Sequence, residues 1–153
     1  MDSFFFCNKK LYLHANTKFY YMNISAGLKI ADVEEICAID DDSISLFLAE
    51  KILEYELPGI PFKSFENVDA SLSYLSENQH TKRLILVDLN MPIKDGWFFL
   101  ENYAGDASKD LIFILSSSDN IADKNKAKSY SHVAGYIEKP ITIESVIDIR
   151  NKY

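Results

Sequence analysis

Five polar side chains in this sequence stand where short apolar segments end, and their types suit the binding of a cation and an anion. They are Asp40 and Asp41 after 36–39, Asp88 after 84–87, Ser116 after 111–115, and Lys139 after 133–137. The apolar segments have the length and composition of strands buried on both faces of a parallel sheet. Ligands of such sheets collect outside the carboxyl ends of the strands. We therefore predict that the five side chains converge at one edge of a sheet.

Convergence would bring together the three carboxylates of Asp40, Asp41 and Asp88. Two carboxylates about 4 to 5 Å apart repel by roughly 4 kcal/mol at an effective dielectric constant of about 20. A divalent cation would offset this repulsion. Mg²⁺ fits best because it prefers oxygen ligands and pairs with one or two carboxylates plus a phosphate, and no Cys or His follows these strands. The sequence therefore predicts Mg²⁺ as the cofactor.

Asp88 follows an unbroken apolar run, Leu84 to Val87, and we interpret it as a nucleophile. A carboxylate can attack phosphorus to give an acyl phosphate. The cation of Lys139 and the hydroxyl of Ser116 would then balance the charge on the remaining phosphoryl oxygens. The structural alternatives are that Asp88 only satisfies a turn and that the Asp40-Asp41 pair only caps a helix.

Strand-like and helix-like segments alternate after residue 35. The predicted strands are 36–39, 62–65, 84–87, 111–115 and 133–137; the predicted helices run from Ser43 to about Leu57, after Asn67, from Trp97, from Asp119 to about Tyr130, and after Pro140. Five such units predict an α/β fold with a doubly wound, five-stranded parallel sheet and helices on both faces. In the first helix we expect Ile44, Leu48, Ile52 and Leu53 to face the core. The helix from Asp119 has few apolar residues, so we expect it to be weakly held.

Composition excludes several classes of protein. Hydrophobic residues make up 48% and charged residues 25%, which are ordinary globular values. The net charge of −7 and the pI near 4.9 argue against a nucleic-acid partner, which usually requires a basic face. Cys7 and Cys37 are the two cysteines, and they suggest reduced thiols rather than a disulfide framework. With no apolar run long enough to cross a membrane and no signal-peptide pattern, we expect a cytoplasmic protein.

Four motifs together resemble a known family. They are Ile39-Asp40-Asp41, Val87 to Pro92 with Asp95-Gly96, Leu115-Ser116-Ser117, and Gly135 to Pro140. In order and spacing, residues 35–153 resemble the receiver domain of two-component response regulators. The resemblance implies the flavodoxin-like strand order 2-1-3-4-5. It also implies a signalling role in which Asp88 accepts a phosphoryl group from a histidine kinase or phosphotransfer protein, with no enzymatic activity beyond self-catalysed phosphorylation and dephosphorylation.

The resemblance assigns a role to each matching residue. Asp88 would be the phosphoacceptor, with Asp41 as a direct ligand of Mg²⁺ and Asp40 as a ligand through water. Asn90 would offer its backbone carbonyl to the metal. Ser116 would be the switch hydroxyl, Lys139 the phosphate-binding cation and Tyr136 the aromatic side chain that follows the phosphorylation state. A cis peptide bond between Lys139 and Pro140 is also implied.

The family further implies an output surface made of the fourth helix, the fifth strand and the last helix. This surface would contact an unknown downstream protein and could form a homodimer. No output module follows Tyr153, so we expect a stand-alone receiver. Asp42 is interpreted as a helix-start residue rather than a ligand. Arg83 and Lys82, where the family often has Pro-Asp, have no evident effect on the chemistry, and His14, His80 and His132 are assigned to the surface.

Residues 1–34 differ from the rest and are interpreted as an N-terminal extension to the receiver domain at 35–153. They contain many aromatic residues without a sustained period of 2 or 3.6. We expect this segment either to add a strand or hairpin to the domain or to mediate self-association. The other interpretation is that translation starts at Met22 and that the residues before it are an annotation artefact.

Two functions from other classes remain as alternatives. A haloacid-dehalogenase-like phosphatase also forms an aspartyl phosphate with Mg²⁺, and the run from Ile39 to Ile44 approximates its Asp-x-Asp motif. That family requires a hydroxyl or valine where Ile44 stands, a further acidic pair and a cap insertion, and it leaves Asp88 without a role. An interaction domain that needs no phosphorylation would instead bind its partner equally well after Asp88→Asn.

Overall fold

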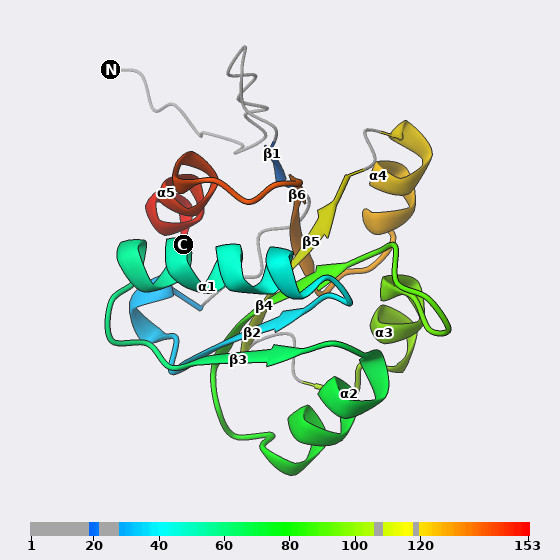
Figure 1. The fold of residues 1–153 in the computed structure, drawn as a ribbon, viewed down its shortest axis with the longest axis horizontal. Helices are drawn as coiled ribbons and strands as arrows, with labels where there is room; N and C mark the ends of the chain where they lie inside the picture. The colour runs from blue at the N-terminus through cyan, green and yellow to red at the C-terminus, as the bar shows by residue number, and fades with distance from the viewer. Residues whose placement is uncertain (1–18, 22–27, 106–108, 118–119) are drawn as a thin grey trace, which may run out of the picture.

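A computed structural model describes residues 19–21, 28–105, 109–117 and 120–153 of the chain. Within these residues one sheet has the strand order β1-β6-β5-β4-β2-β3 (Figure 1). The strands are β1 (Phe19–Tyr21), β2 (Glu35–Ile39), β3 (Phe62–Phe65), β4 (Arg83–Asp88), β5 (Asp110–Ser116) and β6 (Val133–Glu138). From β2 to β6 all neighbouring strands are parallel. Counted from β2 as the first strand, these five parallel strands have the order 2-1-3-4-5. The predicted five-stranded sheet is confirmed.

The strand β1 is added to this sheet at its β6 edge. It pairs antiparallel with β6, and Phe19, Tyr20 and Tyr21 lie opposite Ile137, Tyr136 and Gly135. This is a strand of the kind that we expect from the N-terminal extension. The rest of that extension up to residue 27 lies outside the described residues.

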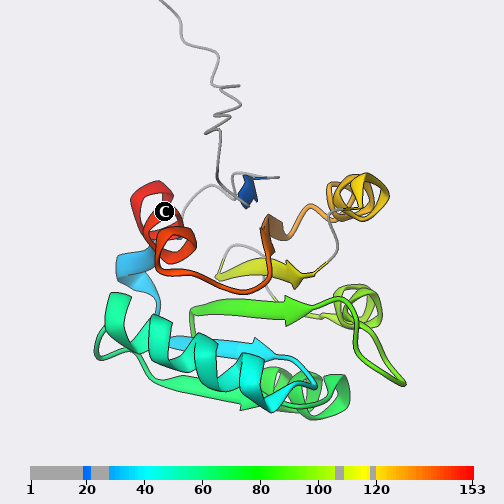
Figure 2. The ribbon, with the colours of Figure 1, turned by 45° about the horizontal axis from the view of Figure 1, so that its top comes forward.

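Helices cover both faces of the sheet. They are α1 (Ser43–Glu56), α2 (Val68–Glu77), α3 (Gly96–Asn102), α4 (Ile121–Ala127) and α5 (Ile143–Lys152), with a short 3-10 helix η1 (Ile30–Asp32) before β2. Figures 1 and 2 show α1 and α5 on one face and α2, α3 and α4 on the other. Among the described residues, no helix has both the length and the apolar character that a membrane crossing demands.

Each face of the sheet has its own hydrophobic core. Alternate residues of the strands point to opposite faces, so Ala38 and Leu86 join the core under α1 and α5, whereas Cys37 and Val87 join the core under α2, α3 and α4. Ile30, in η1, packs into the first core, and its backbone N–H donates to the carbonyl of Tyr153 at 3.0 Å. The segment before β2 and the end of α5 therefore close the same core.

The inward face of α1 differs from our prediction. Ile44 is 75% exposed and Leu48 40% exposed, whereas Leu46, Ala49 and Leu53 are buried. The prediction was wrong for the first two residues because apolar side chains occur at so many positions of this helix that several stripes are compatible with a 3.6-residue period. The choice among them depends on packing against α5, which the local sequence does not specify.

A buried ion pair lies at the amino end of the sheet. Arg83 is 1% exposed, and its Nε donates to Oε2 of Glu35 at 2.9 Å. The guanidinium also donates to the backbone carbonyls of Asn78 and Thr81, and the hydroxyl of Tyr74 donates to Glu35 at 2.6 Å. Arg83 is therefore a structural residue that ties β4 to β2 and to the end of α2.

His132 does not lie on the surface, in contrast to our prediction. Its ring is half-buried and lies 5.6 Å from the ring of Tyr103 and 5.7 Å from that of Tyr130, centroid to centroid. Burial lowers its pKa below the ordinary value of 6.5. A hydrogen bond with the backbone of Leu100 raises the pKa but has the smaller effect. Tyr103, which is distant in the sequence, and Tyr130, two residues before His132, produce this environment.

Candidate functional site

Three predicted acids meet at the carboxyl ends of β2 and β4. Each of Asp40, Asp41 and Asp88 offers a carboxylate oxygen, and these oxygens lie within 4.8 Å of one another. The strands β2 and β4 are parallel neighbours with Ile39 opposite Val87, so the residues after this pair must be adjacent. Asp40 and Asp88 are 3% and 4% exposed, whereas Asp41 is open to solvent. The predicted convergence of these three acids is confirmed.

Lys139, just after β6, contacts two of the three carboxylates. Its Nζ lies 2.5 Å from Oδ2 of Asp40 and 3.0 Å from Oδ2 of Asp88. Burial would lower the pKa of Lys139, but the hydrogen bonds to Asp40 and Asp88 outweigh it and raise that pKa. With the three carboxylates ionised, the group carries three negative charges and one positive charge. The net charge of −2 matches a divalent cation.

The neighbouring acids Asp40 and Asp42 have separate tasks. Burial raises the pKa of Asp40, although Lys139 and the backbone N–H of Asp42, which donates to Oδ1 of Asp40 at 2.9 Å, act in the opposite direction. Asp42 is the N-cap of α1, since its Oδ1 accepts from the backbone N–H of Ile44 at 2.9 Å and its Oδ2 from the hydroxyl of Ser45 at 3.0 Å. The structure confirms Asp42 as a helix-start residue.

Ser116 and Tyr136 form the wall of the site on the β5 and β6 side. Ser116 is fully buried, and Nδ2 of Asn90 donates to its Oγ at 3.3 Å. Tyr136 is also fully buried; burial raises its pKa, while a hydrogen bond between its side chain and Ser116 acts in the opposite direction. The backbone N–H of Asn90 donates to Oδ1 of Asp88 at 3.2 Å. A chain of contacts thus joins Asp88 to the strand β6.

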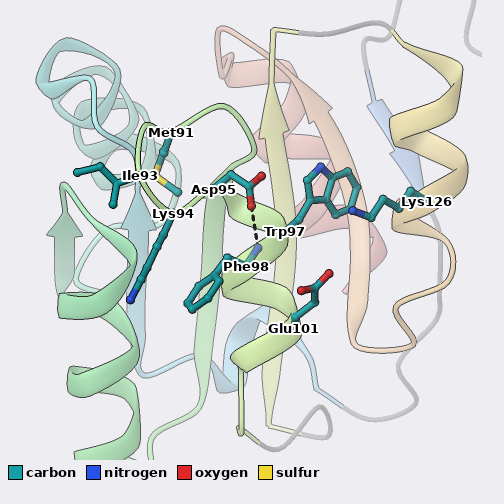
Figure 3. Close-up of a pocket in the computed structure, with 8 residues that line it drawn as sticks. All are labelled: Met91, Ile93, Lys94, Asp95, Trp97, Phe98, Glu101 and Lys126. Atoms are coloured by element: carbon teal, nitrogen blue, oxygen red, sulfur yellow. Dashed lines mark hydrogen bonds between the residues drawn. The ribbon is translucent and has the colours of Figure 1, made fainter.

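The loop between β4 and α3 requires a glycine at its end. A Cβ atom on Gly96 would lie 2.3 Å from the backbone carbonyl oxygen of Asp88, so any side chain there would push the end of β4 away. Asp95 caps α3 by accepting from the backbone N–H of Phe98 at 2.8 Å (Figure 3). The Asp95-Gly96 pair therefore holds α3 close behind Asp88.

A solvent-open hollow of about 420 Å³ lies beside this loop, between α3 and α4 (Figure 3). The ring of Trp97 lines it; Nζ of Lys126 lies 4.2 Å from the ring centroid, and the ring stacks on Tyr130 at 5.9 Å. Trp97 is the only tryptophan of the chain. Trp97 follows Gly96, which lies against the end of β4, so its fluorescence offers a probe of the loop after Asp88.

The structure brings together all of the residues that the sequence predicts for the site. The cis peptide bond that the resemblance implies at Lys139-Pro140 is present. The three carboxylates, two of them buried, offer the oxygen ligands that Mg²⁺ prefers. The lysine and the serine hydroxyl beside them suit the oxygens of a phosphoryl group.

Comparisons with known proteins agree with this geometry. The family model of the "Response regulator receiver domain" matches residues 36–150. The two-component response regulator ARR2 of Arabidopsis thaliana is 28% identical over 115 residues, which are 74% of this chain and 17% of that protein. The chain therefore spans only about a sixth of this relative's length.

Two solved structures share the fold. A two-component response regulator from Cytophaga hutchinsonii is 26% identical with a TM-score of 0.69, over 79% of this chain and 96% of that one. A response regulator receiver protein from Dyadobacter fermentans is 25% identical with a TM-score of 0.66, over 74% and 92%. None of these findings supports the phosphatase alternative. The chain belongs to the response regulator receiver domain family.

Proposed function

We propose that Asp88 is the phosphoacceptor of this receiver and that its phosphorylation controls a signalling output. The observation that carries the proposal is the position of Asp88 at the end of a buried strand, with two further carboxylates and the ammonium group of Lys139 around it. An oxygen of Asp88 would bond to phosphorus while the P–N bond of a donor phosphohistidine breaks. Lys139 would then turn its N–H groups from the carboxylates to the phosphoryl oxygens.

The metal ligands would be the carboxylates of Asp40, Asp41 and Asp88 and the backbone carbonyl of Asn90, with Asp40 acting through water. These ligands would hold Mg²⁺, whose positive charge would offset the negative charge that develops on the phosphoryl oxygens. The net charge of −2 supports a divalent ion at this place. Self-catalysed phosphorylation from small donors and self-catalysed dephosphorylation would use the same ligands.

Ser116 and Tyr136 would transmit the change. Ser116 would donate to a phosphoryl oxygen and give up its contacts with Asn90 and Tyr136, so that the tyrosine repacks. The output surface would be α4, β6 and α5. Ile121 in α4 is 73% exposed, and Ala127 is the buried residue of that helix, so its hold on the sheet is weak. This surface would contact a downstream protein or a second copy of the chain.

The phosphoryl donor would be a histidine kinase or phosphotransfer protein of the cytoplasm. It must bring a histidine into contact with Asp88, so it also has to cover the surface around the site. The first turns of α1, which begins two residues after Asp41, expose Ile44 and Phe47 at 75% and 61%. Exposed apolar side chains of this size favour contact with a protein over contact with a small metabolite.

Labelling with acetyl phosphate tests the proposal. We expect Mg²⁺-dependent incorporation of a base-labile phosphoryl group into the wild-type chain and none into Asp88→Asn. Asp40→Asn should retain some labelling, because it weakens the metal site but keeps the acceptor. Label that survives Asp88→Asn and is lost in Asp40→Asn would point to Asp40 as the nucleophile, as in the phosphatase alternative.

A further inference from the structure

The outer edge of β6 is a surface that accepts an extended strand. The inner edge of β6 pairs with β5, so a five-stranded sheet would leave the outer N–H and C=O groups open. In this chain Phe19–Tyr21 fills that edge, with Tyr20 opposite Tyr136. Figures 1 and 2 show β1 beside β6, in the space between α4 and α5. The occupant of the edge is thus a segment of the chain itself.

The strand β1 is an addition to the family's domain. The family model begins at residue 36, after β1 and η1. Yet β1 lies in the middle of the α4, β6 and α5 surface that we propose as the output. Any protein that pairs with the β6 edge, including a second copy of this chain, must displace β1.

The pairing of β1 is small enough to be displaced. It joins three residues on each strand and lies at the end of the sheet, where one side of β1 has no strand neighbour among the described residues. Short edge strands open with a low free energy compared with central strands. The central strands β4 and β5, by contrast, pair over six residues each.

The β6 residues that pair with β1 also contact the acidic site. Tyr136 lies opposite Tyr20 through its backbone, and its side chain forms a hydrogen bond with Ser116. Two residues beyond the last paired residue, Ile137, the backbone N–H of Lys139 donates to the carbonyl of Ser116 at 2.9 Å, and Nζ of Lys139 contacts Asp40 and Asp88. The short stretch 135–139 therefore contacts both β1 and the site.

We propose that β1 is a built-in competitor for the β6 edge and that a phosphoryl group on Asp88 weakens its pairing, which frees the edge for a partner that adds an extended strand. The inference rests on the proposed function of Asp88. Its direction follows from the contacts: β1 pairs with a β6 backbone whose end is held by Ser116 and by a lysine bound to two carboxylates. Redirecting Lys139 and Ser116 to a phosphoryl group changes that backbone, and a pairing of only three residues has few hydrogen bonds to hold β1 on a changed edge.

Such a coupling has to be reciprocal. If loading the site weakens β1 pairing by some factor, then breaking β1 pairing must strengthen loading by the same factor. We expect a factor of roughly 5 or more, as is typical of coupled sites. Two independent measurements on the full chain can therefore be compared.

The first measurement is residue-resolved amide exchange of the full chain, with Mg²⁺ and with or without beryllofluoride as the phosphoryl analogue. We expect exchange to become about 5-fold faster or more at those amides between Gly135 and Ile137 that point toward β1. Amides of the same strand that point toward β5 alternate with them and serve as an internal control. In Asp88→Asn, beryllofluoride should change neither set.

The second measurement uses proline to break β1 without touching the site. In an antiparallel pair, the N–H of Tyr20 and those of Phe19 and Tyr21 point to opposite sides, and proline removes the N–H. The variant that loses an N–H pointing toward β6 breaks the pairing, and the other variant is its matched control. Tyr20→Pro and Phe19→Pro are therefore compared with each other. The disruptive variant should bind beryllofluoride more tightly by the factor found in the exchange experiment, and the control should bind like the wild type.

The outcomes separate the two proposals. Failure of beryllofluoride to bind the wild-type chain overturns the proposed function. Binding that leaves the β6 amides unchanged, or proline variants that all bind like the wild type, overturns the coupling and leaves the phosphoacceptor intact. Protection of the β6 edge that rises with protein concentration would show that β1 comes from a second copy, which overturns the assignment to the same chain.

Discussion

The ammonium nitrogen of Lys139 lies 3.0 Å from Oδ2 of Asp88, so a cation already holds the carboxylate that we propose as phosphoacceptor. The same nitrogen lies 2.5 Å from Asp40. Lys139 therefore competes with any metal ion for two of the three carboxylates, while it is also the group best placed to receive a phosphoryl oxygen. These two roles predict opposite effects of its removal.

Lys139→Met should bind Mg²⁺ about 10-fold more tightly or more, because the local charge changes from −2 to −3 and the competing cation is gone. Its labelling by acetyl phosphate should slow by about 100-fold or more, because the negative phosphoryl oxygens lose the ammonium group that would stabilise them. Titration of Trp97 fluorescence with Mg²⁺ measures the first effect. Lys94→Met is the matched control, because Lys94 pairs with Asp69 outside the acidic group. Unchanged Mg²⁺ affinity in Lys139→Met would show that the lysine does not compete for these ligands.

Two adjacent acids should separate metal binding from stability. Asp41→Asn removes a predicted ligand. It should weaken the affinity for Mg²⁺ by about 10-fold or more without lowering the midpoint of thermal unfolding. Asp42→Ala removes the N-cap of α1 and should lower that midpoint by a few degrees while Mg²⁺ affinity stays within about twofold. An equal loss of Mg²⁺ affinity in both variants would make Asp42 a ligand and contradict the assignment.

Arg83→Met should destabilise the fold by about 3 to 5 kcal/mol, because it leaves the carboxylate of Glu35 buried without its cation. The free energy of unfolding in urea measures this loss. Lys94→Ala breaks a solvent-exposed pair with Asp69 and should cost about 0 to 1 kcal/mol. Adding Glu35→Gln to Arg83→Met should recover part of the loss; a double variant less stable than Arg83→Met would contradict this explanation.

His132 should make stability depend on pH on the acidic side of its ordinary pKa of 6.5. Burial lowers the pKa in the folded chain, so the unfolded chain binds the proton more readily. Stability is therefore full above about pH 6.5 and falls as the pH drops from there toward the lowered pKa. The slope of the unfolding free energy between about pH 7 and pH 5 should become shallower in His132→Gln. A slope in His132→Gln equal to that of the wild type would contradict this prediction.

Much of the site could be predicted because its residues end apolar segments. Asp88 and Ser116 follow unbroken apolar runs of strand length, and parallel strands bring their ends together whatever the details of packing. The acid that is not a predicted ligand, Asp42, could also be assigned, because a helix starts directly after it.

The environment of single side chains could not be predicted in the same way. Arg83 lies in a core because Glu35, 48 residues earlier in the sequence, offers it a carboxylate, and no local pattern shows that pair. The prediction that Ile44 of α1 faces the core was wrong for a related reason. Packing against α5 selects one of several apolar faces of this helix. Pairing of Phe19–Tyr21 with β6 likewise depends on an open sheet edge more than 100 residues away.

Chemical trapping of the phosphorylated residue tests the central claim most directly. Treating the acetyl phosphate-labelled chain with borohydride reduces an aspartyl phosphate to homoserine, and peptide mass spectrometry then locates it. We predict homoserine at position 88 alone, formed only when Mg²⁺ is present during labelling. Homoserine at position 40 or 41 with none at position 88 would contradict the account.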